Sequence, residues 1–231
     1  NWNQLIIITD KAYSQKIIDK EIMNENKSIA YYEIARIKMH SDNLESTKLI
    51  QKSLILKKNF PPYVKLYLEI LYLNKNISQI KKIAKKYWTE SPNSSLRHAI
   101  VSTLKANNID DIGLVKSIVD KNINNDESKK LLIDFAIHLR DWDLARKNIK
   151  GLIGLQPTNE VCLFMAAIEM GEFNDRQKSE AWKLRAQNAE TGYLWICKIT
   201  NVPQNNWSTL SDTGYFNSLE WKRTKMLSQI Q

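Results

Sequence analysis

The spacing of the prolines is the feature that most constrains the fold. Only five prolines occur in 231 residues, and three of them lie close to a regular interval. Pro61 and Pro92 are 31 residues apart, and Pro157 follows 65 residues later, which is about two further intervals. The segments between them carry apolar residues at helical spacing and no strand-like alternation. Helix–turn–helix units of this length stack into solenoids, so the sequence predicts an all-α solenoid of antiparallel helix pairs.

Apolar periodicity and turn residues predict five helix pairs over residues 28–189. The predicted helices are 28–40 with 44–57, 63–73 with 78–88, 94–105 with 110–119, 127–139 with 142–155, and 161–170 with 179–189. Ser78 is predicted as an N-cap, and residues 122–125 as a turn without proline. Ile80 and Ala145 each lie 12 residues before a closing proline. This pattern resembles tetratricopeptide repeats, whose period is about 34 residues and which pack a small residue between their helices.

The two ends of the chain differ from the predicted repeats. Residues 1–27 are interpreted as an incomplete N-terminal repeat, because Asn1-Trp2-Asn3 resembles Asp141-Trp142-Asp143 inside a later repeat. We therefore expect upstream sequence, with a membrane anchor, to precede this chain. Residues 190–231 contain Trp195, Trp207 and Trp221 among turn residues. They are predicted to form an irregular aromatic tail that caps the solenoid, since a terminal repeat needs a cover for its apolar face.

Composition limits the classes of function. The net charge is +9, and a basic surface attracts nucleic acid, anionic lipid or acidic proteins. However, the Lys and Arg residues are mixed with Asp and Glu and form no block of like charge, which is typical of an ordinary solvated surface. No apolar run approaches the roughly 20 residues of a membrane helix. Cys162 and Cys197 form no disulfide framework, which indicates a reducing compartment, and Cys162 is predicted to be a buried core thiol.

Catalytic motifs are absent from the sequence. It contains no GxSxG, P-loop, HExxH or GxGxxG pattern. His40, His98 and His138 fall in separate predicted helices and are interpreted as surface or groove residues rather than metal ligands. The sequence therefore predicts a protein that is not an enzyme, with no cofactor, metal site or catalytic residue.

A basic ladder is the one candidate binding site. In the tetratricopeptide frame the first helix of each pair lines a concave groove, and Lys65, Arg97 and Lys130 fall at equivalent positions on successive first helices. Such a ladder suits an acidic peptide or a carboxylate. Coincidence in a Lys-rich chain is the alternative interpretation. Three further side chains are predicted near the same surface: Tyr31, Tyr72 and His138.

The second half of the chain carries a more specific likeness. Its motifs are residues 128–154 (SKKLLIDFAIHLRDWDLARKNIKGLIG), 157–169 (PTNEVCLFMAAIE), 181–186 (AWKLRA) and 195–197 (WIC). In this order they resemble the HemY family of alphaproteobacterial type, and residues 2–5 and 87–92 fit its upstream repeats. The resemblance implies transmembrane helices followed by tetratricopeptide repeats, and a part in late haem biosynthesis as an organiser. It also implies a place at the bacterial inner membrane, with this part facing the cytoplasm.

The tail departs from that family, which often continues as a zinc-ribbon-like segment with two CxxC pairs. Here Cys197 stands alone, Thr200 occupies its partner's place, and residues 210–213 (LSDT) replace the second pair. Because tetrahedral zinc needs about four ligands, we expect a degenerate, metal-free segment held by aromatic packing.

Three functional readings remain open from the sequence. The first is a non-enzymatic protein-interaction scaffold associated with haem biosynthesis, whose partners include haem-biosynthesis enzymes. The second is a tetratricopeptide adaptor in another envelope process, such as lipopolysaccharide or cytochrome assembly. The third is a basic helical repeat that binds nucleic acid, although no repeated base-reading pattern or interleaved stacking aromatic supports it.

Overall fold

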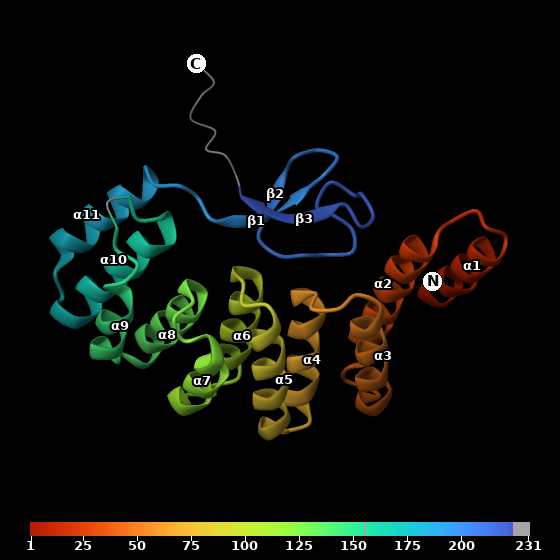
Figure 1. The fold of residues 1–231 in the computed structure, drawn as a ribbon, viewed down its shortest axis with the longest axis horizontal. Helices are drawn as coiled ribbons and strands as arrows, with labels where there is room; N and C mark the ends of the chain where they lie inside the picture. The colour runs from red at the N-terminus through yellow and green to blue at the C-terminus, as the bar shows by residue number, and fades with distance from the viewer. Residues whose placement is uncertain (155, 224–231) are drawn as a thin grey trace, which may run out of the picture. The chain divides into compact units, whose positions relative to one another are not determined.

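The protein is mostly helical, as the sequence predicts. The structure is a computed structural model that describes residues 1–154 and 156–223. Within those residues 66% of the chain is helical, in eleven α-helices that precede a small three-stranded sheet (Figure 1). The chain divides into two compact units, residues 1–108 (unit 1) and residues 109–231 (unit 2).

Unit 1 consists of helices that pack one after another along the chain. Its elements are α1 (Trp2–Ser14), α2 (Lys20–Lys38), α3 (Asn43–Leu56), α4 (Pro61–Leu73), α5 (Ile77–Glu90) and α6 (Ser94–Ala106). α2 packs against α1 and α3, and α4 packs against α3, α5 and α6. Apolar side chains that are fully or almost fully buried form its core: Ile29, Ile50, Tyr63, Leu68, Trp88, Ile100 and Leu104.

Small polar side chains join neighbouring helices inside unit 1. The Ser46 hydroxyl on α3 donates a 2.8 Å hydrogen bond to the Ala35 carbonyl on α2. The Ser28 hydroxyl on α2 lies 3.0 Å from the Tyr63 hydroxyl on α4. All three side chains that supply these hydroxyls are buried, so each hydrogen bond satisfies groups that burial would otherwise leave unpaired.

Two local predictions in unit 1 are wrong. α2 begins at Lys20, eight residues before the predicted start, because Asp19 caps it by accepting a 2.8 Å hydrogen bond from the Ile22 N–H. Asn76, not Ser78, is the N-cap of α5 and accepts from the Gln79 N–H at 3.2 Å. Asn and Ser are nearly equal as N-caps, so the turn before the helix decided which of them took that position.

Unit 2 contains shorter helices and the sheet. Its elements are α7 (Ile112–Val119), the 3₁₀ turn η1 (Asp120–Asn122), α8 (Asp126–Leu139), α9 (Trp142–Ile149), α10 (Asn159–Phe173), α11 (Arg176–Gln187), β1 (Tyr193–Cys197), β2 (Pro203–Gln204) and β3 (Leu219–Arg223). The proline-free turn predicted at residues 122–125 is confirmed. α9 ends at Ile149, shorter than the predicted 142–155, since two glycines follow it; residue 155 lies outside the described residues.

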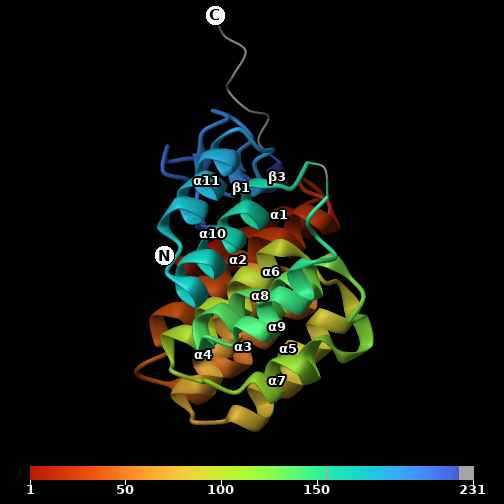
Figure 2. The same ribbon diagram turned by 90° about the vertical axis from the view of Figure 1, so that its left-hand side faces the viewer.

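The core of unit 2 lies among α8, α9 and α10. Ala145 on α9 is fully buried between these helices, as the sequence predicts, and it packs in one cluster with Ile133, Ala136, Ile149, Val161, Met165 and Ile168. Cys162 is also buried, which confirms the prediction of a core thiol. α10 and α11 form a closely packed hairpin that Figures 1 and 2 both show.

The C-terminal segment is more regular than predicted. Its strands form an antiparallel sheet in the order β2-β1-β3, so the expectation of an irregular tail is wrong for residues 193–197, 203–204 and 219–223. Trp195 on β1 lies opposite Trp221 on β3, with ring centroids 5.1 Å apart. The aromatic packing predicted for this segment is therefore present, as a cross-strand pair. Residues 224–231 of the predicted tail lie outside the described residues.

Candidate functional site

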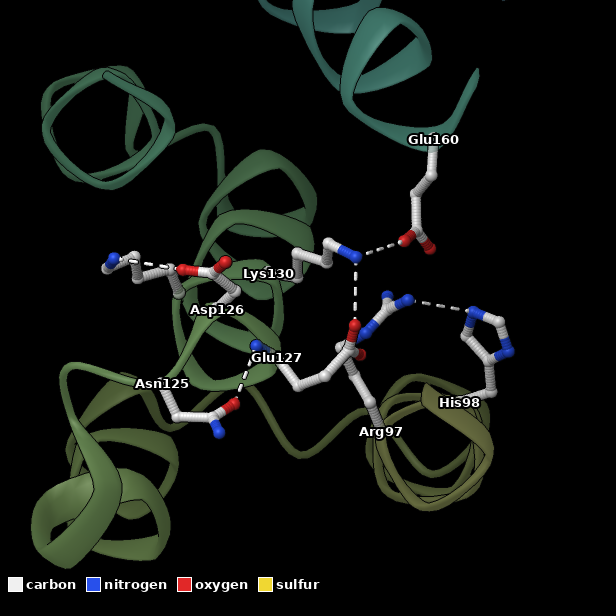
Figure 3. Close-up of polar contacts among 8 residues, drawn as sticks. Arg97, His98, Asn125, Asp126, Glu127, Lys130 and Glu160 are labelled. Atoms are coloured by element: carbon white, nitrogen blue, oxygen red, sulfur yellow. Dashed lines mark hydrogen bonds and ion pairs between the residues drawn. The ribbon is translucent and has the colours of Figure 1, made fainter. Parts of the chain in front are cut away.

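Lys130, the ladder residue of unit 2, is held by two carboxylates. α8 begins at an N-cap, Asn125, whose side chain accepts the Glu127 N–H at 2.8 Å (Figure 3). Glu127 then lies one turn before Lys130, and its Oε1 is 2.8 Å from the Lys130 Nζ. Glu160 on α10 approaches the same Nζ at 3.4 Å. The Lys130 side chain is 16% exposed, so an acidic ligand would have to displace one of these carboxylates to reach it.

Lys65 and Arg97, the ladder residues of unit 1, lie on α4 and α6. Arg97 is fully buried, and its Nη2 lies 3.2 Å from the His98 Nε2 (Figure 3). A surface ligand would therefore reach the Arg97 guanidinium only after that side chain becomes exposed. Lys65 is half-buried one turn before Glu69. Burial raises the pKa of the Glu69 carboxyl, and the nearby Lys65 ammonium opposes this shift.

Two of the remaining predicted groove residues, Tyr31 and His138, have local side-chain partners. Tyr31 on α2 is half-buried, and the Lys52 Nζ lies 5.5 Å from the centroid of its ring. Tyr72 is half-buried near the end of α4. His138 on α8 has its Nε2 3.0 Å from Asp110 Oδ1. The basic ladder as a common ligand site stays a prediction.

An open groove in unit 1, which the sequence did not reveal, runs between α3 and α5. Two adjoining hollows form this α3–α5 groove, with volumes of about 510 Å³ and 400 Å³. Both hollows are lined by Gln51 of α3 and Tyr67 of α4. The Gln51 amide donates a 2.8 Å hydrogen bond to the Tyr67 hydroxyl. This bond ties α3 to α4 where the two hollows meet.

Both apolar and charged side chains line the larger hollow. The apolar contribution comes from all three helices: Leu54, Ile55, Tyr67, Ile83 and Tyr87. Burial raises the pKa of the Tyr87 phenol to about 12, with a smaller contribution from the Glu90 carboxylate, so this ring stays neutral and serves as a hydrogen-bonding and packing surface. The charged groups are Lys58, Lys86 and Glu90.

The groove was not predicted from the sequence, because the tetratricopeptide pattern points to the first helix of each pair as the binding surface. The signal was present on α3, where Leu44, Gln51 and Ile55 recur at intervals that place them on one helical face. Two of these are large apolar residues that a solvated face would not require.

Hydroxyl groups surround the Cys197 thiol at the end of β1. Its Sγ lies 3.3 Å from the Ser218 hydroxyl oxygen and 3.7 Å from that of Thr213, which is itself 3.3 Å from the Thr200 hydroxyl oxygen. Burial opposes ionisation, yet hydrogen bonds with the side chains of Ser218 and Thr200 and with the backbone of Thr200 and Ile199 lower the pKa of the Cys197 thiol to about 5. Within residues 1–154 and 156–223, no group of three His, Cys, Asp or Glu side chains is placed to hold a metal ion.

Comparisons with known proteins do not place the chain in a family. No protein-family model matches it, and a search of curated proteins finds no match. Among the described residues, no helix has the length and apolar character needed to cross a membrane.

Proposed function

We propose that the chain is a non-enzymatic protein-interaction scaffold, built as a tetratricopeptide-like solenoid. In this proposal it is part of a HemY-like protein that is anchored in the inner membrane, faces the cytoplasm and organises haem-biosynthesis enzymes. The motif order at residues 128–197 supports the HemY assignment.

The observation that carries the proposal is the regular spacing of the helices. α4, α6, α8 and α10 begin at residues 61, 94, 126 and 159, so successive starts are 33, 32 and 33 residues apart. A second helix follows each of them: α5 has 14 residues after the 13 of α4, and α7, α9 and α11 are shorter than the helices that precede them. Tetratricopeptide repeats have this organisation and a period of about 34 residues. Such arrays present extended surfaces to partner proteins.

The surface of unit 1 also supports a binding role. The α3–α5 groove combines apolar and hydrogen-bonding groups, as peptide-binding grooves do. In unit 2, Lys130 on α8 forms one ion pair with Glu127 of the same helix and a second with Glu160 on α10, and the second pair joins two helices. A structural role for these charges fits a scaffold better than a catalytic site.

The test is affinity purification of the tagged full-length protein from its own cells, with membranes solubilised in mild detergent and the co-purifying proteins quantified against an untagged strain. We expect ferrochelatase or another late haem-biosynthesis enzyme to be enriched. Repeating the purification after mild crosslinking would recover partners that dissociate quickly.

Other outcomes would contradict specific parts of the proposal. Enrichment of lipopolysaccharide- or cytochrome-assembly proteins would retain the scaffold and refute the link to haem. Enrichment of no protein above the untagged control in either purification would refute the scaffold itself. Binding of random oligonucleotides that is tight and falls steeply with salt would favour the nucleic-acid reading instead.

A further inference from the structure

We infer that the α3–α5 groove binds an acidic peptide segment that carries large apolar side chains. This inference rests on the proposed scaffold function and adds the surface and the chemistry of the partner. The groove lies entirely within unit 1 and is built from the second helix of each of two successive pairs, with α4 as its floor. It is therefore a different surface from the first-helix ladder of Lys65, Arg97 and Lys130.

Exposed apolar residues on α3 indicate the first property of the partner. Leu44 is 70% exposed and lines the smaller hollow, and Ile55 is 69% exposed and lines the larger one. They are eleven residues apart, which is close to three helical turns, so both project from the same face of α3. Covering two such side chains with leucine-sized or phenylalanine-sized groups would remove apolar surface from water, which favours binding.

The charges of the groove indicate the second property. Lys58 follows α3, and Lys86 lies on the last turns of α5, so both ammonium groups flank the same hollow. Neither lysine forms an ion pair with another of the described residues, and Glu90 is the one carboxylate among the described residues that line this hollow. The Lys86 Nζ lies 5.2 Å from the centroid of the Tyr87 ring, which places its charge beside apolar surface. The excess of positive charge is complementary to acidic side chains.

The length of the groove limits the size of the partner. It follows α3 from Leu44 to Lys58, which corresponds to about 21 Å at the helical rise per residue. A partner helix of about 14 residues would span that distance. The hydrogen bond between Gln51 and Tyr67 already orders the floor, so little rearrangement is needed and less binding free energy is lost to ordering.

The binding experiment uses the whole chain and labelled peptides of about 14 residues, matched to the groove length. The probe peptide has Leu and Phe on one helical face and Glu on the flanking positions. One analogue carries Lys in place of each Glu, and a second carries Ser in place of each Leu and Phe. A labelled random oligonucleotide is the fourth ligand. Fluorescence anisotropy measures all four affinities at low and at physiological salt.

Charge-reversal variants test the surface. Lys58→Glu with Lys86→Glu should weaken binding of the Glu peptide by about tenfold or more, because two favourable charge contacts become repulsive. Lys11→Glu with Lys20→Glu changes the net charge by the same amount at exposed positions on α1 and α2, and should leave the affinity within about twofold. Ile55→Ser should weaken the Glu peptide without abolishing its preference over the Lys analogue. Circular dichroism confirms that each variant is folded.

Each result decides the inference. The inference is supported if the chain binds the Glu peptide more tightly than both analogues. This preference should be lost in the groove variant, Lys58→Glu with Lys86→Glu, and kept in the control variant, Lys11→Glu with Lys20→Glu. Equal binding of the Glu and Lys peptides, equal weakening in both charge variants, or stronger binding of the oligonucleotide overturns the inference. If the full-length protein still enriches haem enzymes while the groove variant binds peptides normally, the scaffold stands and this surface assignment fails. If the unaltered full-length protein enriches no protein above the untagged control, the scaffold function itself is refuted.

Discussion

Replacing Gly171 by alanine should have two opposite effects on the free energy of unfolding, a gain from helix propensity and a loss from steric overlap. Gly171 lies on α10, near the helix end, and packs against the Trp142 side chain at the start of α9. Alanine is favoured over glycine within a helix by about 1 kcal/mol. A Cβ at this position would, however, overlap the Trp142 Cη2 and lie only 2.6 Å from Cζ2 and 2.9 Å from Cζ3.

The steric effect should exceed the gain in helix propensity. The overlapping atoms belong to a rigid, half-buried indole ring, so the ring must move by about 1 Å to restore ordinary contact distances. Overpacking of this kind costs about 1–3 kcal/mol. After subtraction of the propensity gain, Gly171→Ala should lower the free energy of unfolding by about 1 kcal/mol, with a range of about 0–2.

Denaturant unfolding followed by circular dichroism measures this difference, and a double-mutant cycle assigns its cause. In a Trp142→Leu background the overlap is removed, so the same glycine substitution should raise stability by about 0.5–1 kcal/mol. The change of sign between the two backgrounds is the expected result. A stabilising Gly171→Ala in the unaltered chain would refute the reasoning, because it would show that the indole ring does not occupy this space.

Four further predictions concern a helix cap and the C-terminal segment. Asn93→Ala should lower the free energy of unfolding by about 1 kcal/mol and Asn93→Asp by much less in denaturant titrations, because the Asn93 side chain accepts the Leu96 N–H at 2.9 Å. In a Cys162→Ala background, which leaves one thiol, absorbance at 240 nm should show the Cys197 thiolate titrating with a pKa of about 5. Ser218→Ala should raise that pKa. A titration midpoint near that of an ordinary thiol in the Cys162→Ala protein would contradict the hydrogen-bond explanation. Because the folded-state pKa of Cys197 is depressed, its ionisation should stabilise the fold fully above the unfolded pKa of about 8.5, and this stability should be lost as the pH falls through 5. Denaturant unfolding of Cys197→Ser and of the unaltered chain at several pH values measures this difference. Zinc content measured by atomic absorption should be far below one equivalent per chain, and a value near one equivalent would overturn the prediction of a metal-free segment.

The helices could be predicted from sequence because their signals are local. α6 begins at the predicted residue, Ser94, and α4 begins at Pro61, two residues before its predicted start. Ala145 was placed between helices by its offset from Pro157, and it is fully buried there. The errors, such as the early start of α2 at Lys20, concern boundaries where several residues can serve as caps.

The candidate sites were less predictable, because a binding surface depends on residues that are far apart in sequence. The larger hollow of the α3–α5 groove joins Ile55, Tyr67 and Tyr87, which come from three helices. Lys130 was predicted as an available cation, but Glu160, thirty residues later, lies within 3.4 Å of its ammonium group. The spacing of residues along one helix can show which of them share a face, but it does not show which residues of other helices lie opposite them.

The sequence by itself determined the helical class and the approximate positions of most helices, since apolar periodicity, caps and turns act over a few residues. Only the tertiary structure decided which polar groups meet and where the surface is hollowed. It also decided that three short strands within residues 193–223 pair as a sheet, in which Trp195 lies opposite Trp221, 26 residues later in the chain. The physical reason is that strand pairing, ion pairing and grooves are stabilised by contacts between distant segments, and short strands carry too little local pattern to reveal their partners.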